Sequence, residues 1–283
     1  MSRQKAEQIY DALMESYSIK DASERWADYR KNISDFLIAN MAPGRTVAMF
    51  GAGEADDVDL ARVYAHAGRL DLYDLDPGKP EKALRKYGLS GKPDVNVFQN
   101  DLFGVTKEEY IGLIELCLND VQKAGAAWTP AMTAPRYLAR IRALYDRINR
   151  REIDFGGKQY DYTIMIGVHS QLNTFLERIW SVFLDLTKQR DFSIAQQVIA
   201  ENEIYIPRVN QGLLDMTREK AFVGLEVEAL DQPGTIQGAV QAIADIEGRI
   251  RKEAVICDSA WMDVWPFREG KEYQMVIYQL DKT

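Results

Sequence analysis

The chain has 283 residues, of which 46% are hydrophobic, and a formal net charge of −8 at pH 7. This length is sufficient for one elaborated α/β domain or for a domain with a cap. The acidic balance argues against an exposed surface for polyanions, so we expect no nucleic-acid partner.

Neither metal binding nor secretion is indicated. Cys117 and Cys257 are the only cysteines and lack metal-type spacing, so we expect no metal site and no disulfide framework. The first residues lack the apolar core of a signal peptide, and no stretch approaches the length of a membrane span. We therefore expect a cytoplasmic protein without a membrane partner.

The N-terminal region is predicted to be helical. Apolar residues recur at helical spacing within 3–41 and predict two helices, with a turn and cap at 21–23. We interpret residues 1–45 as a helical cap and residues 46–283 as the main domain.

A glycine-rich turn follows the first predicted strand. Residues 46–50 are apolar, β-branched at two positions and preceded by Pro43-Gly44, which predicts a buried parallel strand. Gly51 and Gly53 come next. Such a turn before a helix lets a ligand approach the main chain and offers it free N–H groups. Two glycines are equally compatible with a simple tight turn.

The residues after the turn restrict the ligand. A dinucleotide fingerprint requires a third glycine where Asp56 stands, and Asp56, Asp57 and Asp59 would place negative charge beside a pyrophosphate. A Walker-type phosphate loop also fails, because no Gly-Lys-Ser/Thr follows. The turn therefore favours a nucleoside ligand that lacks phosphate and carries positive charge.

Two more strand ends are predicted beside this turn. A crossover helix at 58–68 leads to a second strand that ends at Asp74, roughly twenty residues beyond the glycines, where a carboxylate can accept both ribose hydroxyls. A helix at 76–88 precedes a third strand at 95–98, which is followed by Asn100-Asp101. Glycine, Asp74 and Asp101 are thus expected at one rim of the sheet.

At this point the chain resembles a class I S-adenosylmethionine-dependent methyltransferase. The matching motifs are Phe50-Gly51-Ala52-Gly53-Glu54-Ala55, Tyr73-Asp74-Leu75-Asp76-Pro77 and Asn100-Asp101-Leu102. The resemblance covers roughly residues 46–280. The resemblance implies an α/β fold: a seven-stranded, mostly parallel Rossmann-like sheet closed by a C-terminal antiparallel hairpin. Two departures are Ala55 in place of a third glycine and Met49 in place of an acid; Asp56 or Asp57 are alternatives for that acid.

The resemblance also implies the cofactor and its binding residues. S-adenosylmethionine is the expected cofactor, with Asp74 at the ribose and Asp101 at the adenine amino group. The residues expected to bind it are Gly51, Ala52, Gly53, Asp74, Leu75, Asn100, Asp101, Leu102, Val168 and His169.

Helices that precede the first strand commonly cover the cofactor in this family and help to form the substrate pocket. The expected pocket residues are Tyr17, Trp26, Tyr29, Arg30 and Ser170. Arg30 could pair with a carboxylate of cofactor or substrate. The alternative is that the aromatic residues are core and Arg30 is a surface charge.

A helical insertion is predicted at about 106–158, before the fourth strand. Thr106-Lys-Glu-Glu109 is a capping box for a helix to about Lys123, residues 125–135 are predicted as a loop containing Trp128, and a further helix follows at 137–148. The insertion is interpreted as a lid or a dimer surface, so a homodimer is one expectation.

The fourth strand, at 162–168, is followed by His169-Ser170-Gln171. In this fold class ligands bind beyond the carboxyl ends of the strands. His169 is our candidate catalytic residue, because a neutral imidazole there could accept a proton from the substrate as the methyl leaves sulfur. Alignment alone can also suffice for in-line transfer, and a buried, hydrogen-bonded histidine is the structural alternative.

The remaining chain continues the α/β pattern. We predict a helix at 172–186, followed by two helical pieces at 194–201 and 208–216 that residues 204–207 separate. A strand is predicted at 221–229, then a turn at 232–234 and a helix at 236–250. The runs 260–267 and 272–280 predict a terminal hairpin.

The sequence thus predicts a methyltransferase that acts on oxygen or nitrogen of a small molecule or short peptide. Two alternatives stay open. One is an NAD-type Rossmann oxidoreductase, against which the absent glycine at position 56 counts. The other is a non-catalytic cofactor-binding or scaffold protein of the same fold, because no unambiguous base and no Asn/Asp-Pro-Pro-Tyr motif is present.

Overall fold

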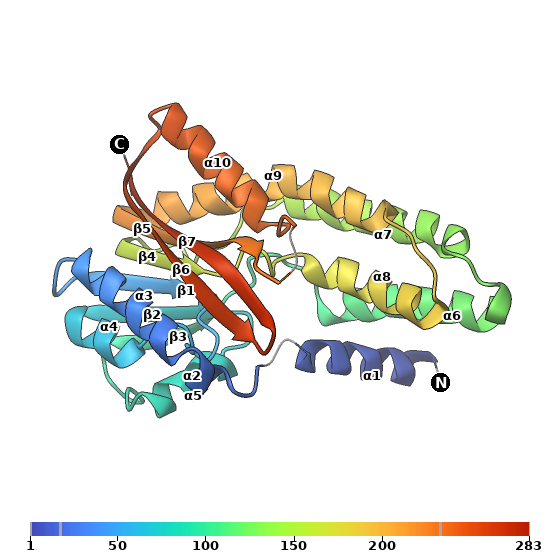
Figure 1. Ribbon diagram of the computed structural model, residues 1–283, viewed down its shortest axis with the longest axis horizontal. Helices are drawn as coiled ribbons and strands as arrows, with labels where there is room; N and C mark the ends of the chain where they lie inside the picture. Colours follow the sequence, from blue (N-terminus) through green and yellow to red (C-terminus); the bar gives the residue numbers. More distant parts are fainter. Residues whose placement is uncertain (1, 17–18, 232–233, 283) are drawn as a thin grey trace. The chain divides into compact units, whose positions relative to one another are not determined.

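The computed structural model describes residues 2–16, 19–231 and 234–282 (Figure 1). The chain divides into two compact units. We call them the sheet unit, which comprises 20–102, 153–170 and 206–283, and the helical unit, which comprises 1–19, 103–152 and 171–205.

The sheet unit is built on seven strands within the described residues, in the order β3-β2-β1-β4-β5-β7-β6. The strands are β1 (Thr46–Phe50), β2 (Arg69–Asp74), β3 (Val95–Gln99), β4 (Tyr160–Ile166), β5 (Thr217–Ala229), β6 (Val255–Arg268) and β7 (Lys271–Lys282). Strands β1 to β5 pair in parallel, whereas β7 runs antiparallel to both β5 and β6. The expected fold class, including the C-terminal hairpin, is confirmed.

Helices pack against this sheet. The helices of the sheet unit are α2 (Ala22–Arg25), α3 (Ala27–Ala39), α4 (Leu60–His66), α5 (Gly78–Lys86), α10 (Ala239–Arg251) and the last part of α9 (Ser193–Met216), and α2 contacts β6. Helix α3 contacts α4 and β6, α5 contacts β2, and α10 contacts β5 and β6. Helix α4 begins after Asp59, whose side chain caps it by accepting a hydrogen bond from the Arg62 N–H.

The core of the sheet explains why β1 is central. Val47 to Phe50 are at most 2% exposed, as expected for a parallel strand that is covered on both faces. Phe50 stacks on Tyr73 of the neighbouring strand with ring centroids 4.7 Å apart. Burial of each such large side chain contributes about 1.5–3 kcal/mol. The strand that leads into the glycine turn is therefore rigidly held.

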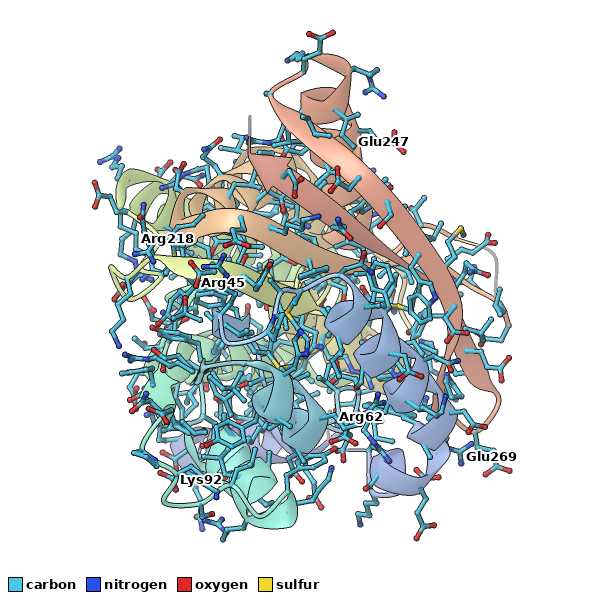
Figure 2. The ribbon with its side chains drawn as sticks, turned by 90° about the vertical axis from the view of Figure 1, so that its left-hand side faces the viewer. Arg45, Arg62, Lys92, Arg218, Glu247 and Glu269 are labelled. Carbon is cyan, nitrogen blue, oxygen red and sulfur yellow. The ribbon has the colours of Figure 1, made fainter. Side chains whose placement is uncertain are left out.

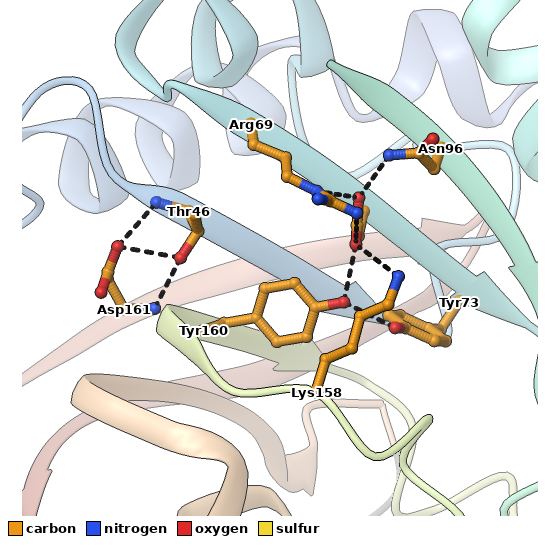
Figure 3. Close-up of polar contacts among 8 residues, drawn as sticks. Thr46, Arg69, Tyr73, Asn96, Lys158, Tyr160 and Asp161 are labelled. Carbon is orange, nitrogen blue, oxygen red and sulfur yellow. Dashed lines mark hydrogen bonds and ion pairs between the residues drawn. The ribbon is translucent and has the colours of Figure 1, made fainter. Parts of the chain in front are cut away.

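The amino-terminal edge of the sheet carries charges and hydrogen bonds. Thr46 donates its N–H and Oγ1 hydroxyl to Asp161 Oδ2 at 2.9 and 2.8 Å, which locks the starts of β1 and β4 together (Figure 3). Arg45 pairs with Glu219 at 3.3 Å and Arg218 with Asp161 at 3.6 Å; both arginines are labelled in Figure 2. Such exposed ion pairs contribute about 1 kcal/mol or less.

The helical unit contains α1 (Ser2–Glu15), α6 (Lys107–Ala124), the 3₁₀ turn η1 (Gly125–Ala127), α7 (Pro130–Arg150), α8 (Thr174–Thr187) and the first part of α9. The predicted capping box is confirmed: Thr106 Oγ1 accepts from the Glu109 N–H at 3.3 Å, and the Thr106 N–H donates to Glu109 Oε2 at 2.9 Å. No helix in the described ranges is long and apolar enough to cross a membrane.

The loop predicted at 125–135 is wrong, because α7 begins at Pro130 and continues through Pro135. A proline at the first helical position loses no hydrogen bond. Trp128 is buried, and its Nε1–H donates to Thr133 Oγ1 at 3.0 Å, which in turn donates to Asp120 Oδ2 at 2.7 Å. These tertiary contacts hold the segment in a helix that Pro135 alone disfavours.

The break predicted at 204–207 is also wrong, because α9 is continuous with Pro207 inside it. Tyr205, Ile206 and Val209 are fully buried around this proline, and Arg249 Nη2 donates to the Pro207 carbonyl at 3.2 Å. Packing therefore outweighs the hydrogen bond that proline cannot make.

The predicted N-terminal cap is divided between the two units. Helix α1 packs on α6 in the helical unit, whereas α2 and α3 pack in the sheet unit. Asp21 does not cap α2 through its side chain; it accepts from Arg25 Nε at 2.9 Å instead. Of the turn predicted at 232–234, Gln232 and Pro233 lie outside the described residues.

Candidate functional site

The glycine turn joins β1 to the loop before α4 in a left-handed conformation. Gly51, Gly53 and Ala55 have φ values of 67°, 51° and 49°. A Cβ atom at Gly51 would lie 2.4 Å from Val168 Cγ2, so packing on Val168 is by itself a reason for this glycine. The Gly51 main chain is nevertheless exposed, and a ligand can approach it closely.

Asp74 at the end of β2 is tied to this turn. Its Oδ2 accepts the Gly53 N–H at 2.8 Å, and its Oδ1 accepts the Asp76 N–H at 2.9 Å. Each carboxylate oxygen can accept a second hydrogen bond, which leaves capacity for two hydroxyl donors. The next residue, Leu75, is 54% exposed and presents an apolar surface beside the carboxylate.

The third strand end adjoins the second. The Asn100 N–H donates to the Asp74 carbonyl at 2.8 Å, and Asn100 Nδ2 donates to the Asp154 carbonyl at 2.6 Å. Leu102 is buried and Asp101 is partly exposed. Strands β1, β2 and β3 lie side by side in the sheet (Figure 1). The structure therefore brings Gly51, Asp74 and Asp101 to the carboxyl-terminal edge of these strands, as the sequence predicted.

His169, the predicted base, is fully buried in the sheet unit. Asn210 Nδ2 donates to Asp245 Oδ2 at 2.9 Å, which directs Asn210 Oδ1 toward His169 Nε2 at 2.8 Å, so the imidazole carries its proton on Nε2. Burial lowers the pKa of His169 to about 4, although Asn210 and the charge of Asp245 act in the opposite direction. The imidazole is neutral at pH 7 but is enclosed by protein, and its role as a base stays a prediction.

The acidic residues after the glycine turn differ from one another. Asp56 Oδ1 pairs with Lys86 at 2.6 Å. Arg30 donates to the carbonyls of Asp56 and Ser23 at 2.8 and 2.9 Å, and its expected pairing with a carboxylate of cofactor or substrate stays a prediction. Burial and the nearby Asp56 raise the pKa of Asp57 to about 6, although its own N–H and the charges of Lys86 and Arg30 act to lower it.

Four other side chains gather around the buried carboxylate of Glu226 on β5. We call Glu226, Ser170, Trp26, Tyr29 and Trp265 the Glu226 cluster. Ser170 donates to Glu226 Oε1 at 2.7 Å, Tyr29 stacks on Trp265 with centroids 6.0 Å apart, and Trp26 meets Trp265 edge-on at 4.9 Å. The tip of the Trp265 ring and Glu226 Oε1 both lie within 3.8 Å of where a Cβ of Gly167 would be. Three predicted pocket residues thus share one cluster; Tyr17 lies outside the described residues.

Polar atoms of this cluster lack partners among the described residues. They are Tyr29 Oη, Glu226 Oε2 and Trp265 Nε1, and their side chains belong to residues that are at most 6% exposed. Burial raises the pKa of Glu226, and the hydrogen bonds from Ser170 and its own N–H offset this only in part. The sequence prediction did not include Glu226 or Trp265. The available signal was a glutamate inside the apolar run of β5.

A second buried carboxylate, Asp71 on β2, is fully paired. Arg69 donates to both its oxygens at 2.9 Å, Asn96 Nδ2 donates at 2.7 Å and Tyr160 Oη at 2.7 Å, while Lys158 Nζ lies 3.5 Å away (Figure 3). Burial acts to raise the pKa of Asp71, but these hydrogen bonds outweigh it and lower the pKa. We interpret this network as structural.

No set of three or more histidine, cysteine, aspartate or glutamate residues in the described ranges is arranged to hold a metal ion. Acidic side chains are common near the glycine turn, but they are individually paired or separated.

No protein-family model and no curated protein matches the chain. Magnesium protoporphyrin IX methyltransferase from Synechocystis PCC 6803 with bound SAH aligns with a TM-score of 0.47 and 12% identity, over 92% of this chain and 84% of its own. The N-methyltransferase NodS from Bradyrhizobium japonicum WM9 in complex with S-adenosyl-L-homocysteine aligns with a TM-score of 0.48 and 10% identity. That alignment covers 96% of this chain and 97% of NodS. A putative RNA methyltransferase from Pyrococcus horikoshii aligns with a TM-score of 0.43 and 9% identity, over 89% of this chain and 84% of its own.

Proposed function

We propose that this chain is a class I methyltransferase that uses S-adenosylmethionine and methylates oxygen or nitrogen of a small molecule or short peptide. The observation that carries the proposal is the hydrogen bond from the Gly53 N–H to Asp74 Oδ2 at 2.8 Å. It joins the glycine turn to the carboxylate that would bind ribose, with Asn100 and Asp101 at the next strand end.

The residues fit an adenosine without phosphates. Asp74 keeps acceptor capacity for the two ribose hydroxyls, Leu75 offers an exposed apolar surface to the adenine, and Asp101 would accept from its amino group. Ala52, Gly53, Leu102 and Val168 would shape the walls.

Asp57 would hold the ammonium group of the methionine part. Among the described residues, no cationic side chain forms an ion pair with Asp57, whereas Asp56 is paired with Lys86. Its raised pKa, about 6, indicates a site in which a cation would stabilise the charged carboxylate. Asp57 would therefore supply the charge that Met49 cannot supply at its own position.

When bound, the cofactor supplies an electrophilic methyl group on a sulfonium. The chain's own contribution to such a transfer is alignment and exclusion of water, which together can lower a barrier substantially. His169 is neutral, as a base requires, but its enclosure by protein favours a role in holding the segment after β4. The proposal does not depend on a proton transfer to His169.

Calorimetry with S-adenosylhomocysteine tests the proposal directly. We expect micromolar binding to the wild type and at least tenfold weaker binding to Asp74→Asn, which loses one carboxylate charge-assisted acceptor. Asp94→Asn is the matched control, because Asp94 is exposed and precedes β3. Absence of binding to the folded wild type at millimolar ligand would remove the proposal.

Two further measurements address the alternatives. Tight NADH binding in a fluorescence titration, with none for S-adenosylhomocysteine, would favour the oxidoreductase; the carboxylates of Asp56, Asp57 and Asp59 count against it. Incubation with labelled S-adenosylmethionine and a cell extract distinguishes an enzyme from a scaffold. A catalyst releases S-adenosylhomocysteine and labels an acceptor, whereas a scaffold only binds. The net charge of −8 favours acceptors other than nucleic acid.

A further inference from the structure

Glu226 lacks the neutralising partner that a buried carboxylate normally has. Its residue is 4% exposed, Oε1 accepts one hydrogen bond from Ser170, and Oε2 has no partner among the described residues. Oε2 is unsatisfied in either protonation state of Glu226. If Glu226 is a carboxylate, no group donates a hydrogen bond to Oε2; if it is a carboxylic acid protonated at Oε2, no group accepts one from it. A buried polar atom without a hydrogen-bond partner carries a desolvation penalty. A ligand that donates to Oε2 would remove that cost.

The surroundings of Glu226 favour a cationic donor. Tyr29 stacks on Trp265, and aromatic faces attract ammonium groups. The charged groups that act on Tyr29 are Asp57, Glu226 and Asp263, all of which are carboxylates and add to the effect of burial in raising its pKa. Tyr29 Oη also has no partner among the residues that the structure describes, and it can accept a hydrogen bond. A neutral hydroxyl or water would satisfy Oε2 but would leave the charge uncompensated.

The cluster lies where an acceptor would be needed. Ser170 follows β4 by a few residues, Gly167 lies against both Glu226 and Trp265, and Gly51 of the glycine turn packs on Val168. These three contacts connect the Glu226 cluster through residues 167–170 to the turn where the cofactor would bind. All of them belong to the sheet unit.

We propose that the Glu226 cluster binds the ammonium group of the methyl acceptor, so that the acceptor is a small organic amine or an amine-bearing compound. Glu226 Oε2 and Tyr29 Oη would accept hydrogen bonds from the ammonium, and Trp265 would cover it. That the bound amine is the methyl acceptor rests on the proposed methyltransferase function. The existence of a cation site at the Glu226 cluster does not require that function.

The test uses propylammonium as the probe and 1-propanol as its neutral match, with binding measured by calorimetry in the presence and absence of S-adenosylhomocysteine. We expect propylammonium to bind the wild type at least tenfold more tightly than propanol. Glu226→Gln should weaken propylammonium binding by about 10- to 100-fold, the value of a hydrogen bond to a charged group. Glu228→Gln, two residues along the same strand and exposed, should leave it unchanged.

A folding readout separates ligand binding from a structural role. Glutamine still accepts from Ser170 at the Oε1 position but has no charge, so Glu226→Gln should raise the Tm of the ligand-free protein while it weakens propylammonium binding. A lower Tm with unchanged propylammonium binding would mean that Glu226 only stabilises the fold, and the proposal would be overturned. Tyr29→Phe, which removes only Oη, provides a second variant and should weaken binding several-fold.

Other outcomes also decide the matter. Equal binding of propanol and propylammonium, or no binding of propylammonium to the wild type, would overturn the proposal. If Glu226→Gln weakened S-adenosylmethionine but not S-adenosylhomocysteine and left propylammonium unchanged, the cluster would face the sulfonium and not the acceptor. Propylammonium binding without any S-adenosylhomocysteine binding would retain the cation site and reject the methyltransferase function.

Discussion

Asp71 and Glu226 are both buried carboxylates of the sheet unit, yet their surroundings are opposite. Asp71 receives hydrogen bonds from Arg69, Asn96 and Tyr160, with Lys158 nearby, and these lower its pKa (Figure 3). Glu226 receives one side-chain hydrogen bond, from Ser170, and burial raises its pKa. A buried charge that is fully paired supports the fold, whereas one that lacks a partner marks a place where a ligand is expected.

The position of each carboxylate along its strand agrees with this difference. Asp71 lies in the middle of β2, opposite Ala48 of β1 and Asn96 of β3, away from the strand ends. Glu226 lies beyond Gly224, which is opposite Ile166, the last residue of β4. Ligands in parallel α/β sheets bind beyond the carboxyl ends of the strands. The fully paired carboxylate thus lies within the sheet, and the carboxylate with one side-chain hydrogen bond lies toward the edge formed by the carboxyl ends of the parallel strands.

The largest effect is expected at Asp71. Asp71→Asn should destabilise the protein by about 3 kcal/mol. This value is the low end for breaking a buried ion pair, and we expect the low end because the side chains of Arg69 and Lys158 are 42% exposed. Urea unfolding at pH 7 measures this. Since the folded pKa of Asp71 lies below its ordinary value of 3.8, the advantage of the wild type should be full above pH 3.8 and disappear as the pH falls through the folded pKa. A stability difference below 1 kcal/mol would contradict a structural role.

Asp57 provides an intermediate case: the residue as a whole is partly exposed, yet burial of its carboxylate raises the pKa to about 6. Below that pH, protonation should compete with the cofactor's ammonium group, so affinity for S-adenosylhomocysteine should fall by up to about tenfold per pH unit. Calorimetry between pH 5 and pH 8 measures the profile. Asp57→Asn should flatten it, and a profile that is identical in this variant would exclude Asp57 from cofactor binding.

Glu226 should show the opposite pH behaviour to Asp71. Glu226→Gln should stabilise the ligand-free protein by about 1 kcal/mol at pH 7. The folded pKa of Glu226 lies above its ordinary value of 4.5, so the wild type loses stability as the pH rises from 4.5 through the folded pKa. The gain from glutamine should therefore grow over that interval and be small at pH 4. Thermal melts at both pH values test it, and a gain that is equal at both would break the comparison.

The smallest effect on stability is expected at Leu75, because its side chain is 54% exposed. Leu75→Ala should change the free energy of unfolding by less than about 0.5 kcal/mol. It should nevertheless weaken S-adenosylhomocysteine binding several-fold, since apolar surface would no longer cover the adenine. Unfolding and calorimetry on the same sample separate the two quantities. Unchanged affinity would remove Leu75 from the site.

Local patterns in the sequence predicted much of the fold. The apolar run of β1, the glycines at 51 and 53, the capping box of Thr106 and Glu109, and the C-terminal hairpin are each encoded within a few neighbouring residues. Because parallel strands present their carboxyl ends at one edge, the order of motifs was also enough to bring Gly51, Asp74 and Asp101 together.

Long-range packing decided the remainder. The sequence predicted a loop up to Pro135 and a break before Pro207, yet burial around these prolines keeps α7 and α9 continuous. The pairing of His169 with Asn210, 41 residues away, and the burial of Glu226 against aromatic residues of α3 and β6 involve partners remote in the chain. The sequence alone determined which strands form and approximately where they end, since both depend on local periodicity. Only the tertiary structure decided which buried polar groups are satisfied, since hydrogen-bond partners are fixed by packing between distant segments.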